Sequence, residues 1–247
     1  MQKTAMIVGI GPGLGYSLAE LFGRKGFRVI LTARREDALK NYQEELKAKG
    51  IEAFVAPADV SDGFQLESTL RSVVEQFGVP DVLIYNVGIT TLDADTHIDA
   101  DTLIERYTVD VAGAYRCIQI LNTPEFAEKK GAVLVTGGGL ALHPHFDYLP
   151  LSMDKAALRA MVYAMHPVLR EKGIFLALVT IMGGIAPGTE FAPERIAESY
   201  WDLYQERSQC EVIFGKKTEE RLKHCNLRLK HCNLSTIPKK GAQNQAP

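Results

Sequence analysis

Cysteine, tryptophan and an excess of either charge are scarce in this chain. Its 247 residues include four cysteines and one tryptophan, and 28 lysines and arginines nearly balance 30 aspartates and glutamates. The cysteines show no disulfide-framework spacing, which favours a reducing, cytoplasmic environment. The balanced charge argues against nucleic acid or a membrane surface as a partner. No apolar run has the membrane-spanning length of about 20 residues, and a strand expected from Thr4 leaves no room for a signal peptide.

A glycine-rich turn separates the first predicted strand from the first predicted helix. Residues 4–8 are apolar and partly β-branched, as in a buried strand, and residues 17–22 have helical periodicity. In such a unit the glycines let the backbone approach a pyrophosphate, and the helix dipole and free N–H groups favour its negative charge. Glycine strings also occur in plain tight turns, but this context favours nucleotide binding. The residues predicted to bind are Gly9, Gly11, Gly13, Leu14 and Gly15.

Strand and helix patterns alternate over residues 1–214. Repeated β-α units of this kind build a parallel sheet with helices on both faces. We therefore predict an α/β fold: a single doubly wound, Rossmann-type domain of about six to seven strands, with its ligand beyond their carboxyl ends. The predicted strands after the first are 27–32, 51–56, 81–85, 132–136, 174–179 and 211–214, and the predicted helices are 14–25, 36–49, 62–77, 99–128, 152–172 and 193–207.

The glycine spacing resembles that of a known family. Gly9, Gly13 and Gly15 do not fit G-x-G-x-x-G, but they resemble the T-G-x-x-x-G-x-G turn of short-chain dehydrogenases/reductases, with Val8 in place of Thr. The resemblance covers residues 1–214. It implies an oxidoreductase that transfers hydride between a nicotinamide dinucleotide and a small carbonyl or alcohol substrate. It also implies that two long helices pack against a second subunit, in a homodimer or homotetramer.

Further positions match the family's cofactor contacts. Asp59 and Val60 follow the third predicted strand and correspond to the Asp-Val pair that the family places beside the adenine ring. Asn86 and Gly88 follow the fourth strand and resemble the family's N-N-A-G segment. Thr189 follows the sixth strand and corresponds to a Thr that touches the cofactor. The resemblance implies that all five residues border the dinucleotide.

The residues after the second strand predict NADP(H) rather than NAD(H). An acid there would accept hydrogen bonds from the ribose 2′-hydroxyl and repel a 2′-phosphate. Arg34 and Arg35 occupy this place, and no acid occurs between them and the second strand. Guanidinium groups bind phosphate by charge and by paired donors. The alternative interpretation is an ordinary solvated arginine pair.

The family's catalytic residues are only partly present. The family uses Asn, Ser, Tyr and Lys; Tyr moves the proton, and Lys holds the nicotinamide ribose four residues later on the same helix face. Lys155 matches the Lys, but Leu151 stands in the Tyr position and has no proton to move. Gly138 stands in the Ser position and Asp110 in the Asn position. The resemblance therefore implies a divergent member without the usual catalytic Ser and Tyr.

Other side chains offer a replacement acid. Tyr148 precedes Lys155 by about two helical turns, although Pro150 lies between them. His143 and His145 lie in the same segment, and a histidine can supply a proton near neutral pH. We predict Tyr148, Lys155 and Asp110 as the catalytic set, with the two histidines as alternatives.

Two functions stay open from the sequence. The first is an NADP-dependent oxidoreductase with a non-standard proton donor and a small-molecule substrate. The second is a catalytically inactive NADP(H)-binding sensor or scaffold protein. The retained cofactor residues suit both, and a fold alone does not decide between them.

Residues 215–247 differ in character from the rest of the chain. They contain eight Lys or Arg and two Asp or Glu, and residues 221–227 are repeated without change at 228–234. Each copy carries a His-Cys pair, whose side chains suit Zn²⁺, but the spacing matches no zinc motif. We therefore predict no metal site and a basic, disordered tail.

Removal of this tail should leave the domain intact. A chain that ends at Gly215 is expected to fold and to keep its NADPH affinity, because terminal segments without burial add little stability. Thermal melting and calorimetry test this. A fall of several degrees in melting temperature, or loss of NADPH binding, would show that the tail is structural.

Overall fold

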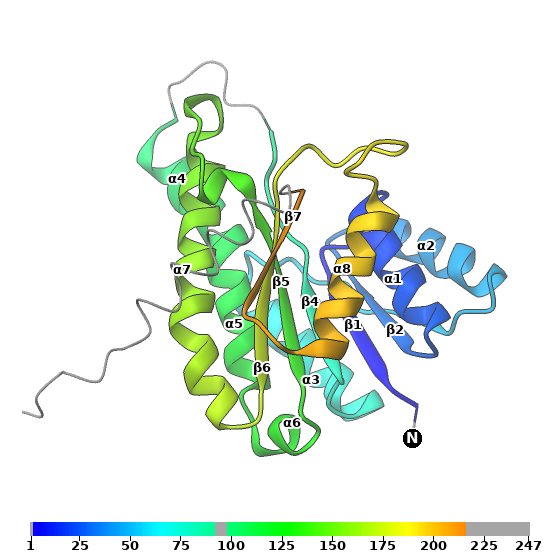
Figure 1. Ribbon diagram of the computed structural model, residues 1–247. Coiled ribbons are helices and arrows are strands. Elements are labelled where there is room, and N and C mark those ends of the chain that lie inside the picture. The colour runs from blue at the N-terminus through cyan, green and yellow to red at the C-terminus, as the bar shows by residue number, and fades with distance from the viewer. Residues whose placement is uncertain (1, 92–97, 216–247) are drawn as a thin grey trace, which may run out of the picture. The chain divides into compact units, whose positions relative to one another are not determined.

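Seven parallel strands form one sheet in the residues that the structure describes, which are 2–91 and 98–215 of a computed structural model (Figure 1). The predicted tail and its repeat lie outside the described residues, apart from Gly215. The strand order is β3-β2-β1-β4-β5-β6-β7. This confirms the predicted parallel α/β sheet. The strands are β1 (Thr4–Val8), β2 (Arg28–Thr32), β3 (Ala53–Val55), β4 (Val82–Tyr85), β5 (Ala132–Gly138), β6 (Phe175–Ile181) and β7 (Glu211–Phe214).

Helices cover both faces of the sheet (Figure 1). One face carries α1 (Leu14–Arg24), α2 (Glu36–Ala48) and α8 (Pro193–Glu206), and the other carries α3 (Gly63–Phe77), α4 (Ala100–Tyr107), α5 (Gly113–Leu121) and α7 (Leu149–Glu171). A short helix, α6 (Pro124–Glu128), precedes β5. Among the described helices, none is both long and apolar enough to cross a membrane.

Two apolar cores form because the central strands are buried on both faces. Every residue of β1, β4 and β6 is buried. Beneath α1 and α8, Phe22 packs edge-on against Phe27 and Trp201. On the other face, Leu158 and Val162 of α7 are fully buried in the second core. Strand residues that alternate between the two cores fix each helix layer against the sheet.

The predicted helix 99–128 is divided into three helices and a π-helical turn. The turn spans Thr108–Ala112 and joins α4 to α5. Helix α5 ends at Leu121, and Thr123 then caps α6 by accepting a hydrogen bond from the Phe126 amide. Pro124 stands at the start of α6, where its missing N–H costs no helical bond. The prediction of one continuous helix was therefore wrong.

Helix α7 begins earlier than predicted. It starts at Leu149 rather than residue 152, and Pro150 lies within its first turn. A proline is tolerated there because the first-turn N–H groups have no partner within the helix. Tyr148 directly precedes the helix as its N-cap residue.

A buried ion pair fastens the edge strand β7 to α7 and β6. Arg159 Nε and Glu211 Oε1 lie 2.9 Å apart, and Glu211 is 2% exposed. Tyr163 and Thr180 also donate hydrogen bonds to the Glu211 carboxylate, at 2.6 and 2.7 Å. Burial alone would raise the pKa of Glu211, but the hydrogen bonds from Arg159, Tyr163 and Thr180 outweigh it and lower the pKa.

Loss of this carboxylate should destabilise the fold. Glu211→Gln is expected to cost about 2–4 kcal/mol in urea unfolding at pH 7, because it leaves a partly buried arginine without its counter-ion. The folded pKa is lowered, so the contribution is complete above the unfolded value of 4.5 and is lost as pH falls below it.

The exposed pair Glu67–Arg71 provides the matched control. Glu67→Gln should change the free energy of unfolding by less than about 1 kcal/mol. Equal effects of the two substitutions would contradict a special role for the buried pair.

Candidate functional site

A cavity of about 800 Å³ lies at the carboxyl ends of β1, β4, β5 and β6. This is where ligands bind in open parallel sheets, beside the point at which the strand order reverses. The cavity brings together many of the residues singled out in the sequence. Those in its wall are Gly9, Gly11, Gly13, Leu14, Gly15, Asn86, Gly88, Gly138, His143, Tyr148, Leu151 and Lys155.

The glycine turn after β1 combines two kinds of glycine. Gly9 has φ +90°, and a Cβ there would lie 2.4 Å from the Asn86 carbonyl oxygen. A Cβ on Gly15 would lie 2.8 Å from the Gly9 carbonyl oxygen. At Gly11 and Gly13, in contrast, a Cβ would meet nothing within 4 Å. Gly9 and Gly15 thus allow the turn to close, and Gly11 and Gly13 leave its cavity side without side chains.

The N-terminus of α1 faces this cavity with its backbone donors available. Within the described residues, no side chain caps this helix, and its first turn carries no acid. The Tyr16 and Ser17 amides donate to the carbonyls of Gly11 and Gly13, whereas Leu14 and Gly15 occupy the first helical positions, whose N–H groups have no acceptor within a helix. The backbone donors and the positive end of the helix dipole suit a phosphate group.

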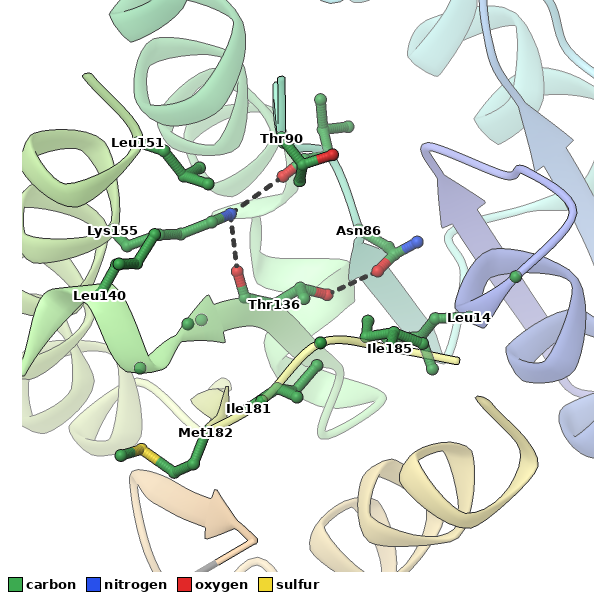
Figure 2. Close-up of a pocket in the computed structure, with 18 of the residues that line it drawn as sticks. Leu14, Asn86, Thr90, Thr136, Leu140, Leu151, Lys155, Ile181, Met182 and Ile185 are labelled. Carbon is green, nitrogen blue, oxygen red and sulfur yellow. Dashed lines mark hydrogen bonds between the residues drawn. The ribbon is translucent and has the colours of Figure 1, made fainter. Parts of the chain in front are cut away.

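A chain of hydrogen bonds joins the glycine turn to β4 and β5. Asn86 Nδ2 donates to the Gly9 carbonyl at 3.0 Å, and Thr136 Oγ1 donates to Asn86 Oδ1 at 2.9 Å (Figure 2). Thr136 Oγ1 also lies 2.7 Å from the hydroxyl of Tyr200 in α8. The side chain of Asn86 is therefore satisfied at both ends, and it holds the turn at a fixed distance from the sheet.

Lys155 extends from α7 to the ends of β4 and β5. Its Nζ donates to the Val87 carbonyl at 3.2 Å. It also donates to the Thr136 carbonyl at 3.2 Å, a bond drawn in Figure 2. An ammonium has three donors, so one remains for the cavity. Burial lowers the pKa of Lys155, and the nearby carboxyl groups of Asp110 and Asp154 oppose this effect.

Asp110 lies in the π-helical turn, fully buried. Its carboxyl group accepts hydrogen bonds from the Ile89 amide at 3.1 and 3.3 Å. Burial raises the pKa of Asp110, and Lys155 opposes that shift. Tyr85 supports the same turn by donating a hydrogen bond to the Val109 carbonyl. Asp110 thus fixes the segment after β4 and stays close to Lys155.

Other predicted cofactor residues lie outside the cavity wall. Arg34 is exposed, and its charge helps to lower the pKa of Asp59, although burial opposes this and Ser61 contributes more. Arg35 pairs with Asp37 at 3.3 Å, which is the solvated arrangement named as the alternative. Val60 is buried.

Thr189 does not line the cavity. Its hydroxyl donates to the Ala186 carbonyl at 2.8 Å and accepts from the Phe191 amide at 3.1 Å, within the loop after β6. The part of this loop that does line the cavity runs from Met182 to Ile185. Of the two alternative histidines, His143 lines the cavity and His145 is absent from its wall.

Comparison with known families identifies the fold. A model of the short chain dehydrogenase family matches residues 3–197. The chain belongs to this family. Two staphylococcal relatives resemble it in sequence. A diacetyl reductase of the (S)-acetoin-forming type from Staphylococcus epidermidis is 28% identical over 175 residues, which are 70% of this chain and 68% of the relative.

The second relative matches a shorter part of the chain. A 3-oxoacyl-acyl-carrier-protein reductase from the same species is 30% identical over 135 residues, 54% of this chain. That match spans 55% of the relative's length.

Solved structures show the same fold. An alcohol dehydrogenase from the archaeon Thermococcus sibiricus, complexed with 5-hydroxy-NADP, superposes with a TM-score of 0.76 at 24% identity and covers 86% of this chain and 96% of its own. LigD of a Sphingobium strain, in its apo form, has a TM-score of 0.79 at 21% identity and covers 96% of this chain and 98% of its own. At these identities the likeness concerns the architecture of the short chain dehydrogenases alone.

Several residues that line the cavity or support its wall could not be singled out from the sequence. Thr136 and Tyr200 meet across 64 positions of the chain, and Leu140, Met182 and Ile185 line the cavity from two separate loops. Ordinary apolar or hydroxyl residues at strand ends carry no local signal of their own. Asp154 of α7 is buried, which is unusual for an aspartate, but an acid on a predicted helix carries no sequence signal of burial.

Proposed function

We propose that this protein is an NADP-dependent oxidoreductase that transfers hydride between NADP(H) and a small carbonyl or alcohol compound. The observation that supports this most is the single cavity wall shared by the glycine turn and Lys155. At one side of the cavity the glycine turn would hold the pyrophosphate. At the other side the buried ammonium of Lys155 would hold the ribose that carries the nicotinamide. The reduced nicotinamide supplies the hydride when bound.

The residues present fit a dinucleotide. The amides of Leu14 and Gly15 and the bare backbone of Gly11 and Gly13 would receive the pyrophosphate. Lys155 has one donor left for a ribose hydroxyl. Arg34 lies exposed beyond β2, at the end of the strand where a 2′-phosphate is recognised in this type of fold.

The cavity favours an uncharged, largely apolar substrate. Leu140, Leu151, Met182 and Ile185 face it from the loops after β5 and β6 and from α7 (Figure 2). No arginine appears among the described residues of its wall, so a carboxylate or phosphate substrate would lack the bidentate partner that usually holds such a group. These features support a small aldehyde, ketone or alcohol.

The proton donor of this enzyme differs from that of its family. Leu151 stands in the place of the family's Tyr and Gly138 in that of its Ser, and both line the cavity near Lys155. Tyr148 lines the same cavity from the N-terminus of α7. We assign the donor role to Tyr148, with Lys155 and Asp110 in support. His143, also in the wall, is the alternative donor.

A catalytically inactive NADP(H)-binding sensor or scaffold is the second candidate. The observation that favours it is Leu151, which is 6% exposed and lines the cavity near Lys155. Its side chain has no ionisable proton and cannot act as an acid. Such a protein would keep the binding residues and lose turnover.

We also propose that the protein forms a homo-oligomer and is located in the cytoplasm. Ile104, Tyr107 and Tyr115 are exposed on α4 and α5, and large exposed apolar side chains on neighbouring helices mark interaction surfaces. They support a homodimer or homotetramer. Cys117 is a buried free thiol, which suits the cytoplasm.

Arg34 should select NADPH over NADH. Arg34→Ala is expected to weaken NADPH binding at least about tenfold, since a charge-assisted hydrogen bond is worth about 1.5–3 kcal/mol, and to leave NADH binding nearly unchanged. Isothermal calorimetry measures both. Arg71→Ala, at another exposed arginine, is the control. Equal affinity of the unmodified protein for NADH and NADPH would contradict the proposal.

Tyr148→Phe should separate turnover from binding. We expect turnover with a panel of aldehydes and ketones to fall by about 10²–10⁴-fold, the usual worth of a positioned acid, with NADPH affinity unchanged. Unchanged turnover would show that His143 or water is the donor.

The double variant Gly138→Ser with Leu151→Tyr is the complementary test, because it restores the Ser and Tyr of the family. The serine should fit, since a Cβ at Gly138 would make only ordinary contact with Lys155, at 3.4 Å. NADPH binding without turnover in the unmodified protein would favour the sensor or scaffold.

A further inference from the structure

The hydroxyl of Tyr200 connects α8 to the end of β5 inside an apolar core. Tyr200 is 0% exposed and belongs to the same core as Phe22. A phenylalanine would give the same apolar packing, so packing does not account for the hydroxyl, and a buried hydroxyl without a partner is costly. Within residues 2–91 and 98–215, its one hydrogen-bond partner is Thr136 Oγ1, at 2.7 Å. The hydroxyl of Tyr200 therefore acts on Thr136.

The direction of this hydrogen bond follows from the protons available. Burial raises the pKa of the Tyr200 phenol, against the opposing effect of its hydrogen bond with Thr136, so the phenol keeps its proton. The Thr136 hydroxyl has a single proton, and Asn86 Oδ1, at 2.9 Å from Thr136 Oγ1, can only accept one (Figure 2). Both hydrogen bonds of Thr136 form together only if Tyr200 donates to Thr136 and Thr136 donates to Asn86.

The same chain of hydrogen bonds decides which end of the Asn86 amide faces the glycine turn. The two ends of an amide have nearly the same shape, but one end accepts and the other donates. Because Thr136 donates to Oδ1, Nδ2 is left to donate to the Gly9 carbonyl, at 3.0 Å. With the amide reversed, two carbonyl oxygens would face each other and this bond to the turn would be lost.

The amide nitrogen of Asn86 lies where the glycine turn closes. A Cβ on Gly15 would lie 3.3 Å from Asn86 Nδ2 and 2.8 Å from the Gly9 carbonyl oxygen. Gly15 is in the first turn of α1, and its N–H is one of the donors that the proposed function assigns to the pyrophosphate. Opening of the turn at Gly9 would displace this donor. The chain of hydrogen bonds therefore runs from the core to the phosphate-binding end of the cavity.

We propose that Tyr200 is a positioning residue for the cofactor. It orients the Thr136 hydroxyl, which orients the Asn86 amide, which holds the Gly9 carbonyl and so keeps the turn closed around the pyrophosphate. The family motifs matched in the sequence do not include Tyr200. The identity of the ligand rests on the proposed function, whereas the order of the hydrogen bonds is a property of the protein alone.

NMR of the Asn86 side-chain amide tests this order in the full-length protein without cofactor. With ¹⁵N labelling, the Asn86 Nδ2 signal is identified by its loss in Asn86→Ala. Tyr200→Phe removes the donor to Thr136, so the signal should shift and its protons should exchange faster with solvent. Tyr163→Phe is the matched control, since it removes another phenol O–H, the donor to Glu211 at 2.6 Å, and should leave the signal unchanged. An unchanged Asn86 signal in Tyr200→Phe would overturn the proposal.

Isothermal calorimetry with NADPH tests the positioning role. Tyr200→Phe is expected to weaken NADPH binding about threefold to tenfold, which is the worth of about one neutral hydrogen bond. Tyr163→Phe should lower the melting temperature and keep the NADPH affinity, because its hydroxyl supports the edge strand β7 instead of the turn. Unchanged affinity in Tyr200→Phe, with folding checked by thermal melting, would refute the positioning role.

A double-mutant cycle separates positioning from a general loosening of the core. Thr136→Val removes the hydroxyl through which Tyr200 acts at nearly constant shape, whereas Thr136→Ser keeps a hydroxyl and should bind NADPH more tightly than Thr136→Val. In the Thr136→Val background, Tyr200→Phe should change NADPH affinity less than about twofold, because residues of one network are not additive. The same loss in both backgrounds would show that Tyr200 does not act through Thr136.

The two proposals fail in different ways. If the unmodified protein does not bind NADPH, the proposed cofactor and its positioning by Tyr200 are both refuted, and the NMR comparison still decides the order of the hydrogen bonds. If the protein binds NADPH with an affinity that does not depend on Tyr200, the proposed function stands and the role of Tyr200 falls.

Discussion

The hydrogen bonds of Thr136 connect the two halves of the site. Its hydroxyl donates to Asn86, which in turn donates to the glycine turn, and its carbonyl accepts from Lys155. One residue near the end of β5 thus sets the distance between the glycine turn and the buried amine of Lys155. The register of β5 between β4 and β6 fixes Thr136 itself, opposite Val179. The register of the parallel strands therefore determines the distance between the two sides of the cavity.

Two buried acids, Glu211 and Asp154, differ in how their carboxyl groups are satisfied. Glu211 lies at the edge of the sheet and is fully engaged by Arg159, Tyr163 and Thr180. Asp154 lies beside the cavity with an oxygen that has no partner among the described residues. A satisfied network rigidifies the structure, whereas an unsatisfied buried group requires another explanation. In this molecule the unsatisfied acid is the one next to the matched lysine.

The predicted bounds of α1, α2, α3 and α8 agree with the structure to within one residue, and those of every strand to within two residues. β1 and β7 begin and end where predicted, because continuous apolar segments between polar or glycine residues have few alternatives. β5 runs two residues further than predicted, through Gly137 and Gly138, since pairing with β6 holds residues that lack strand propensity. The division between α4 and α5 was missed because residues 108–112 contain neither glycine nor proline. That turn depends on the contact of Val109 with Tyr85, which is tertiary.

The residues at the cavity also divide into those with a local sequence signal and those that meet only through tertiary packing. The glycine turn, Asn86 and Lys155, which the sequence singles out, line one cavity because they lie at or reach the carboxyl ends of neighbouring strands. Thr189 was expected at the cofactor from the family resemblance, and His145 was an alternative proton donor. Neither lines the cavity, because the conformation of a loop does not follow from its position in the sequence. Partners such as Thr136 and Tyr200 meet only when distant helices settle on the sheet.

The π-helical turn has a consequence for how this site tolerates change in length. Its hydrogen-bonded ring contains one residue more than that of an α-helix, and each residue of a helix turns the chain by about 100°. Deletion of one residue between Thr108 and Ala112 would restore regular winding and rotate either α4 or the buried face of α5 away from its neighbours. Asp110 faces the site through this single extra residue. The direction in which Asp110 points therefore depends on the number of residues in this helical segment, and not only on the identity of its side chain.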